Sequence, residues 1–245
     1  MLLYMQGILP LRNAKSAAPS GRDAGIKNFG IYKEMNNTQP TDIELRDGMN
    51  AFQRAVKRFF DLLLSALLLL LLSPVFLLVS LLIRRRSEGP VFFRQERIGY
   101  GGRPFQIVKF RTMPQNYESD GIPRLSGRGD LATEPLGRFL REHHLDELPQ
   151  LWNVLVGDMS FVGPRPERQY FIDQIMQRNP DYVYIYKMRP GLTSMATLYN
   201  GYTDTMEKML IRLQMDLEYL KKRSLWLDIK IIFTTANYLL NGKKI

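Results

Sequence analysis

One stretch constrains this chain more than any other, because the residues from Phe59 to Ile83 are almost wholly apolar. A single helix of about 25 residues extends about 37 Å, which exceeds the roughly 30 Å hydrocarbon core of a bilayer. A single-pass membrane anchor is therefore one interpretation of this segment.

Pro74 favours a second interpretation. It has no N–H to donate to the carbonyl of Leu70, so the helix should bend at Ser73–Pro74 into arms of about 14 and 9 residues, neither of which crosses a bilayer. Basic residues flank both ends of the apolar segment, at Arg54, Lys57 and Arg58 and at Arg84, Arg85 and Arg86. Under the positive-inside tendency, these flanks favour a re-entrant helix with both ends cytoplasmic and the break at Ser73 and Pro74.

The composition limits which partners, nucleophiles and metal sites this chain can have. A formal charge of +10 favours anionic partners, which include nucleic acid, an anionic membrane surface and phosphorylated substrates. The absence of cysteine excludes disulfides, thiolate nucleophiles and cysteine-ligated zinc, and only two histidines are present. Any metal ion should therefore be a hard cation bound by oxygen ligands.

The rest of the chain predicts an α+β fold that is mainly helical. Residues 1–50 lack a helical or strand period and predict a mobile N-terminal extension, which precedes the membrane segment 51–86 and a domain over 87–245. Two β-prone runs around the glycine-rich turn at 99–102 predict a hairpin whose second strand could carry Lys109 and Arg111 toward a ligand.

Further elements are expected on either side of the central motifs. The polar, glycine-rich residues 114–130 predict a mobile loop. Helices are expected at 133–141, at 167–178 and as a pair over 203–241 with a joint near Arg223–Ser224, and a short extended run at 192–199.

The residues from His143 to Pro166 carry the strongest chemical signal. Asp146 and Glu147 are adjacent, Arg138 and Arg141 lie just upstream, and Arg165 stands between Pro164 and Pro166. If Asp146 caps a helix that begins at Glu147, both carboxylates lie at the positive end of its dipole, where a phosphate would also be drawn. Taken alone, D-E-L-P-Q is more often an ordinary acidic helix start, but the combination suggests chemistry on a phosphate.

Several motifs in this order resemble the bacterial polyprenyl-phosphate sugar-phosphate transferases, also called monotopic phosphoglycosyl transferases. The motifs are K-R-F-F-D before an apolar segment with a Ser-Pro break, K-F-R-T-M, L-D-E-L-P-Q-L-W-N-V-L, G-D-M-S-F-V-G-P-R-P, R-P-G-L-T and L-D-I-K-I-I. The resemblance implies a re-entrant membrane helix and a cytosolic catalytic domain of short helices with a small sheet. It also implies a location at the cytoplasmic face of the bacterial inner membrane.

The activity implied by the resemblance is transfer of a sugar 1-phosphate from a UDP-sugar to polyprenyl (undecaprenyl) phosphate. UMP would leave, and an aspartyl-phosphosugar would form as the intermediate. Such a reaction initiates lipid-linked glycan assembly, as in exopolysaccharide or lipopolysaccharide biosynthesis. The implied partners are the UDP-sugar, polyprenyl phosphate and membrane lipids, with a possible homodimer and no nucleic acid.

Residue by residue, the resemblance makes Asp146 the nucleophile and Glu147 its partner, and the two together would engage Mg²⁺. The implied substrate-binding residues are Arg141, Arg165 with Pro164 and Pro166, and more weakly Lys109, Arg111 and Arg138. The sequence departs from the family pattern at His143–His144 and in G-L-T-S-M-A-T-L-Y-N-G, and these departures bear on the preferred sugar. A structural role is the expected one for each histidine.

Two other functions are compatible with parts of the pattern. One is a catalytically silent membrane scaffold of glycan assembly, against which the intact Asp146–Glu147 pair argues. The other is a membrane-tethered nucleic-acid-binding protein, but no helix-turn-helix or RNA-binding signature is present.

Overall fold

The computed structural model describes residues 45–86, 88–113, 135–201 and 203–241. Most of the predicted N-terminal extension (1–44) and the predicted loop at 114–130 lie outside these residues. The helices are α1 (Ala51–Leu71), α2 (Ser73–Arg86), α3 (Pro135–Glu142), α4 (Gln150–Val156), α5 (Gln169–Met176), α6 (Met195–Asn200), α7 (Met206–Lys222) and α8 (Leu225–Leu240), with 3-10 helices η1 (Tyr100–Gly102), η2 (Leu145–Glu147) and η3 (Pro180–Lys187). The strands are β1 (Phe92–Ile98), β2 (Pro104–Phe110), β3 (Ser160–Val162) and β4 (Gly191–Thr193).

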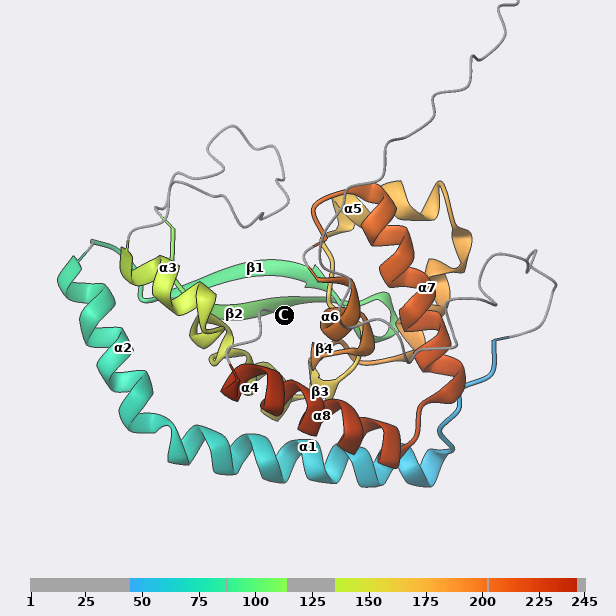
Figure 1. Cartoon of the computed structure of the whole chain (residues 1–245), viewed down its shortest axis with the longest axis horizontal. Coiled ribbons are helices and arrows are strands. Elements are labelled where there is room, and N and C mark those ends of the chain that lie inside the picture. The colour runs from blue at the N-terminus through green and yellow to red at the C-terminus, as the bar shows by residue number, and fades with distance from the viewer. Residues whose placement is uncertain (1–44, 87, 114–134, 202, 242–245) are drawn as a thin grey trace, which may run out of the picture. The chain divides into compact units, whose positions relative to one another are not determined.

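The apolar segment forms the bent helix pair α1–α2 (Figure 1). The two helices meet at 59°, and the hydroxyl of Ser73 donates to the carbonyl of Leu70 at 2.8 Å. Pro74 has no N–H to donate to this carbonyl, so the predicted helix break is confirmed. Both helices are longer than the predicted arms because they continue into the basic flanks. Among the described residues, no single helix is long and apolar enough to span a membrane, whereas the bent pair is.

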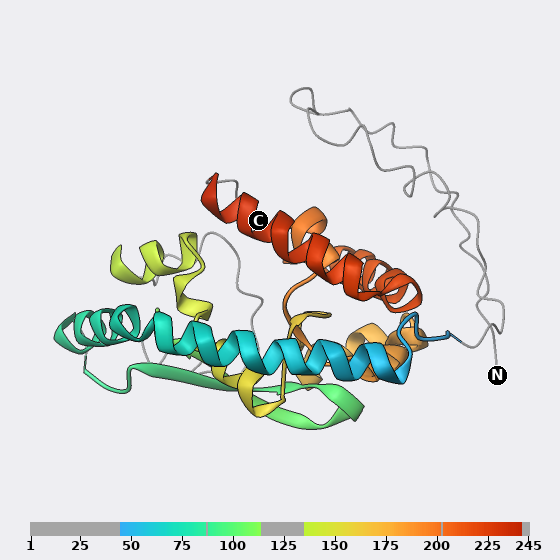
Figure 2. The same ribbon diagram turned by 90° about the horizontal axis from the view of Figure 1, so that it is seen from below.

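The two faces of α1 differ in chemistry. One face is exposed and apolar, and it includes Phe59, Phe60, Leu63, Leu67 and Leu70. On the other face, Lys57 donates to Asp228 of α8 at 2.5 Å, and Asp61 accepts the backbone N–H of Phe161 at 3.1 Å. The charged residues of this helix therefore hold it to the rest of the domain. Seen from below, the hairpin and α8 lie on opposite sides of α1 (Figure 2).

The predicted hairpin is confirmed. Strands β1 and β2 pair antiparallel from Phe92 opposite Phe110 to Ile98 opposite Pro104. The turn between them requires glycine, because Gly101 and Gly102 have φ angles of 68° and 71°.

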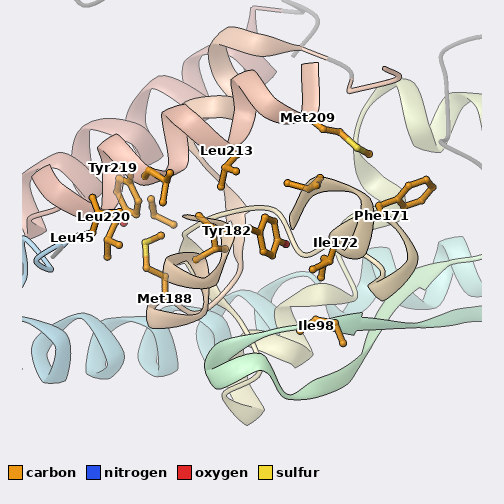
Figure 3. Packing of buried hydrophobic residues seen from close by; sticks show 14 of the residues in the cluster. Leu45, Ile98, Phe171, Ile172, Tyr182, Met188, Met209, Leu213, Tyr219 and Leu220 are labelled. Carbon is orange, nitrogen blue, oxygen red and sulfur yellow. The ribbon is translucent and has the colours of Figure 1, made fainter. Parts of the chain in front are cut away.

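The largest hydrophobic core lies between α5, η3 and α7 (Figure 3). Apolar residues recur three or four positions apart in α7, which is typical of a buried helix face, and Met209, Leu213, Leu217 and Leu220 are buried there. A smaller cluster joins α2 to β2 and α3 through residues Val79, Ile83, Phe110 and Leu140. The second core therefore connects the bent helix pair to the strand and helix that lead to the central motifs.

The region from 160 to 200 differs from the prediction in two places. The extended run predicted over 192–199 is wrong beyond Thr193, because Ser194 accepts the N–H of Thr197 at 2.9 Å and starts α6. The helix predicted over 167–178 is shorter, since α5 begins at Gln169 and ends at Met176.

Strands β3 and β4 form a parallel pair that the sequence analysis did not anticipate. A side chain at Gly163 would lie 2.2 Å from the carbonyl of Arg189, so glycine is needed where these chains approach. The predicted joint between the last two helices is confirmed, because α7 ends at Lys222 and Ser224 caps α8 through the N–H of Leu227.

Helix α8 buries Ile231 but leaves Trp226 and Phe233 exposed at 75% and 71%. A role in the hydrophobic core alone therefore does not account for these two aromatic side chains.

Candidate active site

The paired carboxylates lie in a tight turn between α3 and α4. His144 adopts a left-handed conformation with φ 55°, and the short 3-10 helix η2 follows it. Asp146 is buried inside this turn, so the prediction that it caps an α-helix is wrong. Pro149 explains the difference, because α4 begins only after this residue, which has no N–H to contribute to a preceding turn.

Glu147 is held by two cations from different elements. Its Oε1 atom accepts from Nζ of Lys109 at 2.6 Å and from Nη2 of Arg165 at 3.1 Å. Burial alone would raise the pKa of Glu147, but the charges of Lys109 and Arg165 outweigh it and hold this pKa well below its ordinary value. Glu147 is therefore ionised at neutral pH.

The pKa of Asp146 changes in the opposite direction. Burial, followed by the negative charge of Glu147, raises the pKa of Asp146 to about 6, although Lys109, Arg141 and Arg165 oppose the change. The two neighbouring carboxyl groups thus differ sharply in their affinity for a proton. Additional positive charge beside Asp146 would favour its ionised form.

These two residues fit a magnesium ion shared with a substrate. Mg²⁺ prefers oxygen ligands and commonly takes one or two carboxylates together with substrate phosphates. Asp146 and Glu147 supply such oxygens, and the raised pKa of Asp146 marks a position where a cation is favourable. Within the part of the chain that the structure describes, no group of three or more acidic or histidine side chains is arranged around a common point. The residues present therefore suit a shared ion better than a closed protein cage.

Asn153 places α4 against the hairpin. Its Oδ1 atom accepts the N–H of Val108 at 3.0 Å, and its Nδ2 atom donates to the carbonyl of Gln106 at 2.7 Å. Because Lys109 follows Val108 directly, this double contact sets the strand that delivers Lys109 to Glu147. This role of Asn153 was not predicted from the sequence, and its place in the motif L-W-N-V-L is the available signal.

Arg58 of the bent helix pair also acts on α4. Its guanidinium donates to the carbonyls of Val154 at 2.6 Å and Leu155 at 3.0 Å. Helix C-termini leave such carbonyls without partners inside the helix, so Arg58 completes the end of α4.

Arg165 reaches the site from the loop after β3. Its side chain is 41% exposed, whereas its neighbours Pro164 and Pro166 are buried. The carbonyl of Pro164 accepts the N–H of Gly191 at 2.9 Å, which ties the loop to β4. The Pro-Arg-Pro motif therefore fixes its backbone and presents its arginine.

The remaining predicted residues occupy different places. Arg141 is close enough for its charge to lower the pKa of Asp146. Arg138 is exposed on α3, and no described contact joins it to the carboxylates. Arg111 is buried, and its Nη1 atom donates to the carbonyl of Glu88 at 2.6 Å. His143 packs against Phe139, with ring centroids 4.3 Å apart and the ring planes tilted by 36°.

The structure thus brings Asp146, Glu147, Lys109 and Arg165 together, with Arg141 nearby. Such an arrangement can bind a diphosphate through its cations and present a buried carboxylate to it. Arg97, Glu167 and Arg212 also surround the Pro-Arg-Pro loop and were missed. Glu167 follows Pro166 directly, and the sequence pattern predicted it at the start of a helix.

Comparison with known proteins gives a consistent result. The family model described as bacterial sugar transferase matches residues 52–242. The chain is 41% identical over 187 residues to a UDP-N-acetylgalactosamine-undecaprenyl-phosphate N-acetylgalactosaminephosphotransferase of Aeromonas hydrophila, a match that covers 76% of this chain and 44% of that protein.

Two proteins named UDP-glucose:undecaprenyl-phosphate glucose-1-phosphate transferase are also similar. The one from Escherichia coli (strain K12) is 42% identical, with 77% of this chain and 41% of that protein covered. The one from Caulobacter vibrioides is 45% identical, with 75% and 69% covered. The chain thus spans less than half the length of the Aeromonas and Escherichia relatives and about two thirds of the Caulobacter one.

Proposed function

The chain belongs to the bacterial sugar transferase family, and we propose that it transfers a sugar 1-phosphate from a UDP-sugar to a polyprenyl phosphate such as undecaprenyl phosphate. One observation carries this proposal. Asp146 and Glu147 lie side by side in a turn that buries Asp146, where Lys109, Arg141 and Arg165 supply positive charge. The names of the relatives support the same substrate classes.

The residues account for attack by a carboxylate on a diphosphate, which like charges normally oppose. Lys109 and Arg165 neutralise Glu147 and extend positive charge toward the bound diphosphate. Mg²⁺ held by Asp146 and Glu147 would supply further charge neutralisation at the phosphate oxygens. Asp146, with its pKa raised to about 6, is still largely ionised at pH 7.5 and can act as a nucleophile.

The reaction consists of two displacements at one phosphorus. A carboxylate oxygen of Asp146 forms a bond to the phosphorus next to the sugar, the bond to the UMP oxygen breaks, and UMP leaves with the electron pair. An oxygen of polyprenyl phosphate then attacks the same phosphorus, and the Asp146 carboxylate leaves unchanged. The product is a polyprenyl diphosphate sugar, the first intermediate of a lipid-linked glycan.

The identity of the released nucleotide tests this function. Purified protein in detergent is incubated with UDP-sugars, MgCl₂ and undecaprenyl phosphate, and the nucleotides are separated. We expect UMP in equal amount to the lipid-linked product. Stoichiometric UDP would mean attack at the sugar carbon and a different class of transferase, and no nucleotide release from any UDP-sugar would favour a silent scaffold.

We further propose that α1 and α2 enter and leave one membrane leaflet from the cytoplasmic side. The 59° bend, the Ser73–Leu70 hydrogen bond and the exposed apolar face of α1 support this topology. The helices would hold the carboxylate pair near the headgroups, where a soluble nucleotide sugar and a lipid phosphate can meet.

Thiol labelling tests the topology cleanly because the chain has no cysteine. Single cysteines are introduced at Gln53 and Glu88, and intact cells are treated with a membrane-impermeant reagent. We expect both sites to be protected until the cells are opened. In a second variant that also carries Ser73→Ala and Pro74→Ala, the site at 53 should become partly accessible from outside. Labelling of the site at 53 from outside without these changes would establish a single-pass anchor.

A further inference from the structure

A second buried charge cluster lies behind Arg165. Glu167, only two residues after Arg165, is buried, and its carboxylate accepts a hydrogen bond from Nη1 of Arg212 on α7. The same carboxylate forms an ion pair with Arg97 of β1, with 3.5 Å between Nη1 and Oε2. Three elements that are distant in sequence therefore meet at one glutamate.

The cluster is also bound to the backbone of the Pro-Arg-Pro loop. Nη1 of Arg97 donates to the carbonyl of Pro166 at 3.1 Å, and the N–H of Ile98 donates to the carbonyl of Glu167 at 3.0 Å. Glu167 thus holds the loop through its main chain and its side chain at once. Arg165 is the residue of this loop that points outward, toward Glu147.

The position of the loop depends on the negative charge of Glu167. Arg97, Arg165 and Arg212 bring three positive charges close together, and Glu167 is the acid that Arg97 and Arg212 share. A cavity of about 20 Å³ lies beside them, lined in part by Arg165, Glu167 and Arg212. If Glu167 lost its charge, repulsion would push the arginines apart, and the loop would lose the ion pairs that fix it.

We propose that Glu167 is a positioning residue that, through Arg97 and Arg212, holds the Pro-Arg-Pro loop so that Arg165 can meet the diphosphate of the nucleotide sugar. This inference rests on the proposed function for the identity of the ligand. Glu167 is enclosed by its two arginines and does not itself serve as a ligand or nucleophile.

Glu167→Gln is the decisive substitution, because it keeps the shape and removes the charge. Loss of the partners that orient metal ligands typically costs about 10- to 100-fold in affinity or activity, and we expect kcat/KM for the UDP-sugar to fall by a similar factor when the partner that orients this loop is changed. The KM for undecaprenyl phosphate should not change, and Glu167→Asp should restore part of the lost activity. The matched control is Glu218→Gln, which makes the same change at a half-exposed glutamate of α7 that pairs with Lys221 and Lys222, and it should leave the kinetics unaltered.

A double-mutant cycle separates positioning from a general loss of structure. If Glu167 acts through Arg165, then Glu167→Gln in an Arg165→Ala background should lower kcat/KM by less than about twofold, since contacts that share a pathway are not additive. The full loss in that background would overturn the inference. Wild-type kinetics in Glu167→Gln alone would overturn it as well.

A measurement without substrate keeps the inference distinct from the proposed function. Hydrogen–deuterium exchange of peptides that cover residues 160–170 should be faster in Glu167→Gln than in the wild type and unchanged in Glu218→Gln. If the wild-type protein releases no UMP, the proposed function fails, and the exchange experiment still decides whether Glu167 holds the loop. Equal exchange in wild type and Glu167→Gln would mean that it does not.

Discussion

Two of the charge clusters in this protein, one around Asp228 and one around Glu147, are built differently. In the layer that joins α1 to α8, the carboxylate of Asp228 accepts from Lys57 at 2.5 Å and from the hydroxyl of Tyr219 at 2.6 Å. In the cluster around Glu147, two carboxylates lie in adjacent positions, and the pKa of Asp146 rises to about 6. The first cluster pairs one carboxylate with one cation, whereas the second places two adjacent carboxyl groups beside the cations Lys109 and Arg165.

This difference separates a structural role from a chemical one. Opposite charges with good hydrogen bonds satisfy one another and hold two helices in place. In the second cluster, Lys109 and Arg165 neutralise Glu147, but the pKa of Asp146 stays raised, so its negative charge is unfavourable there, which is typical of a functional site. We therefore infer that the Lys57–Asp228 pair holds α1 against α8 and that the cluster around Asp146 acts in catalysis.

The largest expected effect comes from Asp146→Asn, which keeps the shape and removes the nucleophile. UMP release should fall by at least about a thousandfold, or roughly 4 kcal/mol in transition-state stabilisation, while the melting temperature is maintained. Asp204→Asn, at an exposed position, is the control and should retain activity. Near-normal turnover in Asp146→Asn would show that the cluster around Asp146 has no catalytic role.

A smaller effect, on stability alone, is expected from Lys57→Met. The substitution leaves Asp228 buried without its cation, which should lower the free energy of unfolding by about 3 kcal/mol. Denaturant titration in detergent measures the change, and protein that remains folded should keep its kcat. Lys208→Met removes an exposed ion pair with Asp204 and should change little. Equal stability of Lys57→Met and wild type would show that the layer does not hold the helices.

The smallest effect is expected on the pH dependence of stability, and it concerns Asp216, a buried carboxyl outside both clusters. Burial raises the pKa of Asp216 to about 7, with Arg212 opposing the shift. A carboxyl with a raised pKa binds its proton more tightly when folded, so its contribution to stability falls as pH rises from about 4 to about 7 and then levels off. The stability of Asp216→Asn relative to wild type should therefore rise over this range.

The expected gain is on the order of 2 kcal/mol, about half of the full effect of a carboxyl pKa raised to about 7, because a tenfold change in proton affinity corresponds to about 1.4 kcal/mol. A small cavity borders Asp216, and water entering it would offset part of the desolvation. Thermal unfolding of both proteins at pH 4 to 8 measures the difference. A pH-independent difference would mean that Asp216 ionises normally.

The sequence alone predicted those parts of the fold that depend on local chemistry. Proline breaks a helix because it lacks an N–H, so Pro74 predicts the bend between α1 and α2. Glycines 99, 101 and 102 mark the hairpin turn, and the spacing of apolar residues in α7 indicates its buried face. The adjacent carboxylates and Arg165 were identifiable by the same means.

The remaining features arise from contacts between distant segments. The parallel pairing of β3 with β4 needs Gly163 to meet Gly191, which no local period reveals. Glu167 was assigned to a helix because its neighbours are compatible with one, and its partners Arg97 and Arg212 lie far away in the chain. The local pattern at Asp146 was misinterpreted as a helix cap because Pro149 delays α4 beyond it.

Trapping the covalent intermediate tests the central claim most directly. The protein is mixed with a UDP-sugar and MgCl₂ in the absence of polyprenyl phosphate, quenched in acid and digested for mass spectrometry. We expect one equivalent of UMP and a phosphosugar on the peptide that contains Asp146, which should disappear when undecaprenyl phosphate is added and should not form in Asp146→Asn. An adduct on any other residue, or its persistence in Asp146→Asn, would contradict the assignment of Asp146 as the nucleophile.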